Sequence, residues 1–201
     1  MSRTSPGRYA LHEFAKNVYQ VSFEDGAGEA LEATRPDLHE WRVTGHDGTV
    51  RMRYTLFGDQ RDGTYAAIGP EGAMLNAPAS FVWARGLEDH PTQVQFDLPD
   101  GWTVATQLVA EGGDMFSAPD LAYFLDSPIL IGDLDVRSWT VTWGDETAQM
   151  HFAIDHQASD AELDRYMAWV EPVVMEVLAV YDRVPGFDYV QDSFLPSYLP
   201  Y

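Results

Sequence analysis

Two short segments come close to a zinc-binding motif. In the motif H-E-x-x-H, carried on a helix, two histidines one turn apart bind zinc and the glutamate acts as general base on the metal-bound water. The segment HEFAK, beginning at His12, has Lys16 where the second histidine would stand, and an ammonium group cannot bind a metal cation. The segment HEWRV, beginning at His39, ends in Val43 and falls at the start of a predicted strand. We therefore assign no catalytic and no metal-binding residue to this chain.

A second histidine pair, His151 and His156, has Asp155 between its members. The two side chains would point to opposite faces of a strand, or about 140° apart on a helix, so one metal ion could be shared only across a bend. An independent metal enzyme using this pair is one interpretation, and strand-end histidines without a ligand role are the other. We favour the second. The sequence also lacks a G-x-S-x-G nucleophile motif, a phosphate-binding loop and a dinucleotide-binding turn.

The six tryptophans raise a carbohydrate-binding alternative, because sugar-binding modules stack sugar rings on exposed indoles. All but one fall inside alternating segments or at their ends, where an aromatic ring is more often part of the core. We therefore favour a core role for most of them. They are Trp41, Trp83, Trp102, Trp139, Trp143 and Trp169.

The composition describes a folded and strongly acidic protein. Its 201 residues fit one domain, or one domain and part of another, and 45% hydrophobic residues can form a core. The net charge of −20 argues against binding to nucleic acid or to an anionic membrane surface, because both need a basic face. The acidic residues are dispersed, which favours a general composition bias over a cation-binding surface or a cationic partner.

Targeting and redox features are few. The sequence has no apolar run of about 18 residues that would span a membrane. No secretory signal is visible at the N-terminus, which favours a cytoplasmic location. The absence of cysteine excludes disulfides and a cysteine nucleophile but does not fix the compartment.

The stretch from Met74 to Leu108 dominates the predicted architecture. It contains three apolar runs, at residues 81–83, 94–98 and 102–106, separated by turn-forming Gly, Pro and Asp residues. Alternation with a period of two between such breaks is typical of antiparallel strands with one buried face. The sequence therefore predicts a layer of antiparallel strands in this region.

Further strands are predicted on both sides of this layer. Asp47-Gly48 separates two alternating runs and predicts a hairpin turn between them. Residues 58–79 are rich in Gly and Pro, and we interpret them as loops around one short strand. We expect a short helix at residues 121–125 and a loop at residues 111–114. The remaining predicted strands cover residues 19–25, 41–44, 49–57, 65–68, 129–134, 137–143 and 148–154.

A helix follows the last of these strands. Ser159 and Glu162 form a capping box, and apolar residues then recur at three- and four-residue spacing. This predicts an amphipathic helix of about 24 residues, kinked by Pro172 and ended by Pro185-Gly186. The fold class is thus mainly β, an antiparallel and sandwich-like domain followed by one long C-terminal α-helix, and α+β overall. We place the domain boundary between residues 1–147 and 148–201.

Several long segments resemble the amino-terminal β domain of the glycyl aminopeptidase family. This family contains zinc metallopeptidases of the thermolysin-like (gluzincin) group. The resemblance runs through nearly the whole chain in the right order. The segments are PGRYALHEFAKNVYQV at Pro6 to Val21, LNAPASFVWARGLEDHP and DLPDGWTVATQL within residues 74–108, and FSAPDLAYFLDSPILIGDL at Phe116 to Leu134.

The resemblance implies that this chain is the non-catalytic N-terminal portion of a zinc-dependent aminopeptidase that favours small N-terminal residues such as glycine. It would support the active-site cleft and control substrate access, with Pro70 and Asn76 in the access loop 69–76. Zinc is expected in the full-length protein but not in this chain, which lacks H-E-x-x-H and is expected to be inactive. The implied partners are the rest of the catalytic domain and peptide substrates. The alternative is a stand-alone β-rich binding or scaffold module without enzymatic activity.

The resemblance also implies a chain cut at both ends. It would lack the first strands of the β domain and would contain only the first strand and helix of a truncated catalytic domain, residues 148–201. An unpaired sheet edge and a partly uncovered helix would follow. We therefore expect the isolated chain to be marginally stable or to self-associate.

Overall fold

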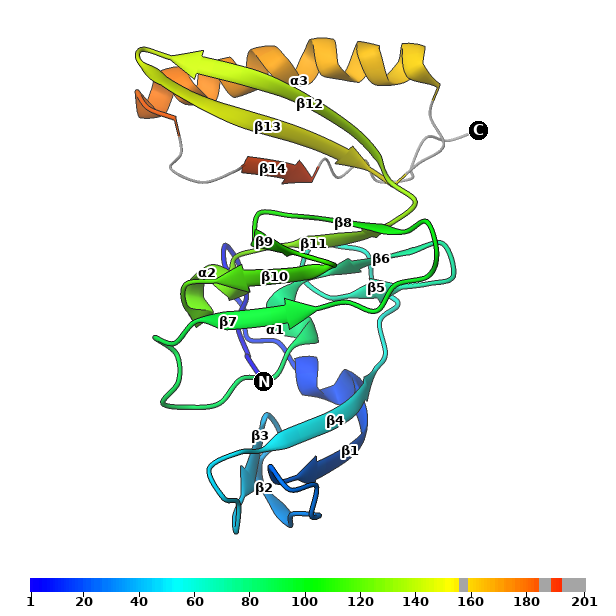
Figure 1. Ribbon diagram of the computed structural model, residues 1–201, viewed down its shortest axis with the longest axis vertical. Helices are drawn as coiled ribbons and strands as arrows, with labels where there is room; N and C mark the ends of the chain where they lie inside the picture. The colour runs from blue at the N-terminus through cyan, green and yellow to red at the C-terminus, as the bar shows by residue number, and fades with distance from the viewer. Residues whose placement is uncertain (156–158, 185–188, 193–201) are drawn as a thin grey trace.

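The computed structural model describes residues 1–155, 159–184 and 189–192. The chain forms three tiers along its longest axis, from strands β1–β4 at one end, through two central sheets, to helix α3 with its sheet at the other end (Figure 1). Within the described residues, no helix is both long and apolar enough to cross a membrane.

The first tier consists of two separate two-stranded antiparallel sheets. After the 3-10 helix η1 (Phe14–Asn17), strand β1 (Val18–Glu24) pairs with β4 (Arg51–Leu56). Strand β2 (Ala33–Asp37) pairs with β3 (Glu40–Val43) through a tight turn. Phe14 is fully buried and lies at the centre of the apolar cluster of this tier, together with Ala15, Val18 and Ala79.

The predicted hairpin at Asp47-Gly48 is wrong. β3 and β4 do not pair with each other, because β3 pairs with β2 and β4 pairs with β1. Asp47 Oδ1 accepts hydrogen bonds from the backbone N–H of Thr49 (2.9 Å) and of Gly26 (3.3 Å). These bonds tie the turn to the loop after β1, and the turn therefore crosses from one sheet to the other.

The middle tier contains two antiparallel sheets. One has the strand order β5-β6-β11-β8 and the other β7-β10-β9. The four-stranded sheet uses β5 (Ala67–Ile68), β6 (Gly72–Leu75), β8 (Thr103–Thr106) and β11 (Ile129–Gly132). The three-stranded sheet uses β7 (Thr92–Gln95), β9 (Val109–Gly112) and β10 (Met115–Ala118). Two short helices, α1 (Ala77–Ser80) and α2 (Leu121–Leu125), complete the tier.

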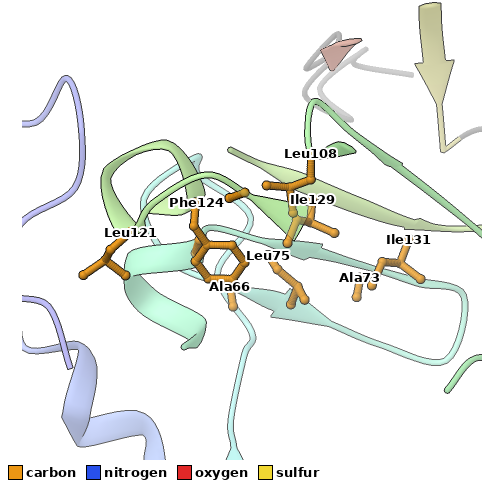
Figure 2. Close-up of a cluster of buried hydrophobic side chains, with 10 residues drawn as sticks. Ala66, Ala73, Leu75, Leu108, Leu121, Phe124, Ile129 and Ile131 are labelled. Atoms are coloured by element: carbon orange, nitrogen blue, oxygen red, sulfur yellow. The ribbon is translucent and has the colours of Figure 1, made fainter. Parts of the chain in front are cut away.

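The main hydrophobic core lies in this middle tier (Figure 2). Ile129 and Ile131 project from the central strand β11, and Ala73 and Leu75 project from the neighbouring β6. Side chains of the β7-β10-β9 sheet and of α2 pack against the same cluster, so both sheets share one core. Phe124 of α2 is 3% exposed and meets Phe81 edge-on, with ring centroids 5.1 Å apart.

The upper tier is built from β12 (Asp135–Trp143), β13 (Glu146–Ile154), β14 (Tyr189–Asp192) and α3 (Asp160–Tyr181). β12 and β13 pair over nine residues, and β14 joins β13 in parallel. One stripe of α3 packs on this sheet and buries Leu163, Met167, Val174 and Leu178. Arg61, from the middle tier, forms an ion pair with Asp155 at the end of β13.

Both ends of α3 are capped within the described residues. At the start, Ser159 and Glu162 form the predicted capping box, with the Ser159 N–H donating to Glu162 Oε2 at 2.9 Å. At the end, Asp182 has a left-handed backbone with φ of 53°, and its N–H donates to the carbonyl of Leu178. Pro172 lies inside the helix. The predicted stop at Pro185-Gly186 lies outside the described residues.

We expect Ser159→Ala to lower the free energy of unfolding by about 1 kcal/mol, because it removes the side-chain acceptor at the N-cap. Ser159→Thr is the matched control, since its hydroxyl can still cap the helix and still donate to the Glu162 carboxylate. Urea unfolding monitored by tryptophan fluorescence measures both variants. Equal stability of the two variants would contradict the assignment of the cap.

The mainly β, antiparallel character and the C-terminal helix are confirmed, and the helix at residues 121–125 has the predicted bounds. A sandwich is not confirmed as such. Besides the hairpin, two further local predictions are wrong: residues 81–83 are not a strand, and residues 72–75, expected to be loop, form β6. Residues 111–114, predicted as a loop, form the end of β9 and the tight turn that follows it.

The β12-β13 hairpin spans the predicted domain boundary at residue 147, and this domain division stays a prediction.

Candidate binding groove

A groove with a volume of about 920 Å³ opens in the first tier, and we call it the N-terminal groove. Five parts of the chain that are distant in sequence line it. They are the N-terminal residues 1–4, Phe23 of β1, the β2-β3 hairpin, the β4 side with Val50, Met52 and Tyr54, and residues 82–85 after α1. Alternation along β4 places Met52 and Tyr54 on the same face, half-buried, with Arg51 and Arg53 exposed on the other.

One carboxylate connects two arginines on the rim of this groove. Glu40 lies 3.6 Å from the guanidinium of Arg42 and accepts a hydrogen bond of 3.2 Å from Arg85. Both arginine side chains are largely exposed, at 66% and 79%. Such pairs contribute little to stability in water. Each guanidinium has five N–H donors, so both arginines keep donors for a further anionic group.

An aromatic ring and a third arginine lie next to this network. The guanidinium of Arg35 is 4.7 Å from the centre of the Trp41 ring, in a cation–π arrangement. Arg35 also donates a hydrogen bond to the carbonyl of Leu38, in the turn of the β2-β3 hairpin. Trp41 is therefore held in place on the groove wall.

His39 is a buried residue of the groove, with 7% of its surface exposed. Burial lowers the pKa of its imidazole below the usual 6.5, and the Arg3 guanidinium adds to this, against the opposing charges of Asp37 and Glu13. The His39 backbone N–H donates to Asp37 Oδ1 at 3.0 Å, and this bond lowers the pKa of the Asp37 carboxyl. The N-terminal amine of Met1 donates to the His39 carbonyl, also at 3.0 Å.

The lowered pKa of His39 predicts a loss of stability in mild acid. A histidine with a folded-state pKa below its unfolded value favours the folded state above the unfolded pKa, and this contribution is lost as the pH falls from there towards the folded pKa. We therefore expect His39→Gln, which cannot be protonated, to lose less stability than the wild type between about pH 7.5 and about pH 5.5. Urea unfolding at the two pH values measures this. An equal loss in both proteins would contradict the prediction.

Two buried polar atoms of the groove have no hydrogen-bond partner within the described part of the chain. They are His39 Nδ1 and Trp83 Nε1. Buried polar groups are normally paired, so an unpaired one is often a sign of a missing ligand or water. Both residues line the N-terminal groove.

The near-motif at His12 serves packing in the structure. Its imidazole stacks on Phe14 with ring centroids 5.0 Å apart and meets the edge of Tyr65. His151 Nδ1 lies 2.8 Å from Ser138 Oγ of the paired strand, and His156 is outside the described residues. Among residues 1–155, 159–184 and 189–192, no group of three or more His, Asp or Glu side chains could hold a metal ion.

The predicted access loop has a different structure from the one expected. Pro70 lies in the exposed turn of the β5-β6 hairpin, which the Gly69 N–H closes on the Gly72 carbonyl. Gly72 to Leu75 are buried as β6, because their strand pairs with β11 in the middle of the sheet. Asn76 is half-buried and its Nδ2 donates to Ser5 Oγ at 3.0 Å. The description of residues 69–76 as a loop is wrong; their role in substrate access stays a prediction.

Five of the six tryptophans are half-buried and pack against the core clusters, as the core interpretation predicts: Trp41, Trp83, Trp102, Trp139 and Trp143. Trp41 and Trp83 also line the N-terminal groove. Trp169 is 60% exposed on α3. Sequence reasoning did not find the groove, because the segments that line it are distant in sequence and meet only in the folded chain.

The fold of this chain is also found in a larger protein of known structure. The crystal structure of the aminopeptidase N family protein from Idiomarina loihiensis superposes with a TM-score of 0.81 at 18% sequence identity, over 94% of this chain and 33% of that one. The present chain thus spans about a third of the length of that protein. At this identity the similarity establishes the fold alone.

The family of the chain follows from its sequence. The model of the peptidase M61 N-terminal domain matches residues 1–133, about two thirds of the 201 residues, so the chain belongs to this family. The resemblance of the chain to a peptidase amino-terminal domain is thereby confirmed. The match ends at the junction between β11 and β12, where the upper tier begins. A comparison with curated proteins found no match.

Proposed function

We propose that the chain is the non-catalytic N-terminal portion of a zinc-dependent aminopeptidase of the glycyl aminopeptidase type. The observation that supports this most directly is the family match over residues 1–133, followed by a strand hairpin and a helix that continue the fold. In this role the two central sheets would form a rigid support beside an active-site cleft and would limit which peptides enter. The zinc ligands and the general base would come from the remainder of the protein.

The remainder of the catalytic domain is the proposed partner, and α3 is its proposed docking surface. Besides the stripe buried on the sheet, α3 has a second apolar stripe with Trp169, Val173, Val177 and Val180 exposed at 60%, 56%, 47% and 80%. A shallow apolar hollow around Pro172 lies on the same face. A helix that is apolar on two sides usually packs between two layers. The related protein of known structure is about three times as long, which leaves ample chain for a second layer.

We also propose that the domain boundary lies between Gly132 and Asp135, earlier than the sequence indicated. The core of residues 66–131 and the clusters under α3 are separate. The family match ends at residue 133. A boundary here keeps β12 and β13 together as one hairpin.

The proposal is tested on the native protein. An antibody against this chain is used to purify its target from source cells, and the material is assayed for hydrolysis of glycyl-p-nitroanilide with and without a zinc chelator. We expect a band several-fold larger than the 201-residue chain, with chelator-sensitive activity. A band at the size of this chain without activity would overturn the proposal. A stand-alone binding module, the alternative that the N-terminal groove favours, would then be the better description.

A further inference from the structure

The N-terminal groove is locally basic in a strongly acidic molecule. The chain has 12 basic and 32 acidic residues, a net charge of −20. Three arginines line the groove, Arg3, Arg42 and Arg85, against two acids, Asp37 and Glu40. The guanidinium of a fourth arginine, Arg35, lies over the ring of Trp41, which lines the groove. Basic residues therefore outnumber acidic residues in the groove, whereas acidic residues predominate in the whole chain. A cleft lined by charges of one sign raises the local concentration of ligands that carry the opposite charge.

Apolar and aromatic side chains line part of the groove. They include Phe23, Met52 and Tyr54, and Trp41 and Trp83 add indole rings. A ligand that offers carboxylate groups along an apolar body would match these side chains together with the rim arginines.

We propose that the N-terminal groove binds an extended peptide segment with alternating acidic and apolar side chains. Acidic side chains would meet Arg42 and Arg85 at the rim, and apolar ones would lie beside Met52 and Trp83. The volume of about 920 Å³ lies within the range of sites that enclose a ligand of this kind. A long polyanion such as nucleic acid does not fit, because the rest of the surface repels it. The inference does not depend on the proposed function.

The test is isothermal titration calorimetry of the full chain with two synthetic peptides. The acidic probe is acetyl-Glu-Val-Asp-Val-Glu-amide, and the control peptide has lysine at each acidic position. We expect saturable binding of the acidic peptide alone, weakened by added salt. Arg85→Glu should weaken binding about tenfold or more, because it repels the carboxylates. Arg165→Glu on α3 is the matched control, an exposed arginine of the upper tier, and should leave the affinity unchanged.

Three outcomes would overturn the proposal. The first is no binding of the acidic peptide, or equal binding of both peptides. The second is an equal effect of Arg85→Glu and Arg165→Glu. The third is displacement of the peptide by inorganic phosphate at an equal concentration, which would mean a site for small anions in place of a peptide groove. Circular dichroism of each variant verifies that the fold is intact, because Arg85 is 79% exposed and its replacement should not disturb the core.

Discussion

Val174→Asp should lower the free energy of unfolding by at least about 3 kcal/mol, whereas the same substitution at the neighbouring Val173 should change it by less than about 1 kcal/mol. Val174 is 7% exposed and packs with Val141, Met150 and Leu178 between α3 and its sheet. A carboxylate there would be buried without a partner. Val173 is 56% exposed, and a carboxylate in its place stays in water.

The two variants form a matched pair, because the substitution is the same and the two positions are adjacent in α3. They differ in whether the side chain is buried or exposed. Urea unfolding gives their stabilities, and sedimentation velocity gives their association states. We expect Val173→Asp to increase the monomer fraction if the exposed stripe of α3 drives self-association, since it introduces charge into an apolar patch. Equal destabilisation by the two variants would show that both faces of α3 are covered in the isolated chain, against the docking surface proposed here.

Phe14→Ala should cost about 3–5 kcal/mol, the typical loss for a large aromatic side chain removed from a core. Phe14 is fully buried, stacks on His12 and meets Tyr65 edge-on at 5.1 Å. It thereby holds the N-terminal segment against the loop that precedes β5.

Phe57→Ala serves as the control for this substitution. Phe57 is 55% exposed at the end of β4, and its replacement should cost less than about 1 kcal/mol. Both variants are compared by urea unfolding of the full chain. A loss below about 1 kcal/mol for Phe14→Ala would mean that the first tier is not a cooperative part of the fold.

The sequence pattern predicted the helices and strands whose signals lie within a few neighbouring residues. The capping box fixed the start of α3, and Asp120 caps α2 by accepting the Tyr123 N–H at 2.8 Å. The long alternating runs of β12 and β13 were also found. β6 was missed because Gly72 to Leu75 lacks alternation, as expected for a short strand buried on both faces. Gly72 is needed there, since a Cβ would come within 2.7 Å of the Ile131 carbonyl oxygen.

Long-range pairing is what sequence reasoning could not predict. Asp47-Gly48 is a typical hairpin signal, yet Asp47 bonds to Gly26, which precedes it by 21 positions. The N-terminal groove depends on the same choice of partners, because residues of β1, β4 and the β2-β3 hairpin all line it. A local sequence signal is enough to predict that a turn forms. Which strands the turn connects depends on which pairing of strands into sheets has the lower free energy.

The connection between β11 and β12 consists of two residues, Asp133 and Leu134. Three Cα–Cα steps allow no more than roughly 11 Å between Gly132 and Asp135. One end of this connection is fixed, because β11 is flanked by β6 and β8, and Arg61 holds Asp155 across the same junction. The upper tier therefore has little freedom to swing. If the proposed partner domain packs on α3, it would be held at a nearly constant angle to the central sheets, and any opening motion of the proposed peptidase would have to occur elsewhere.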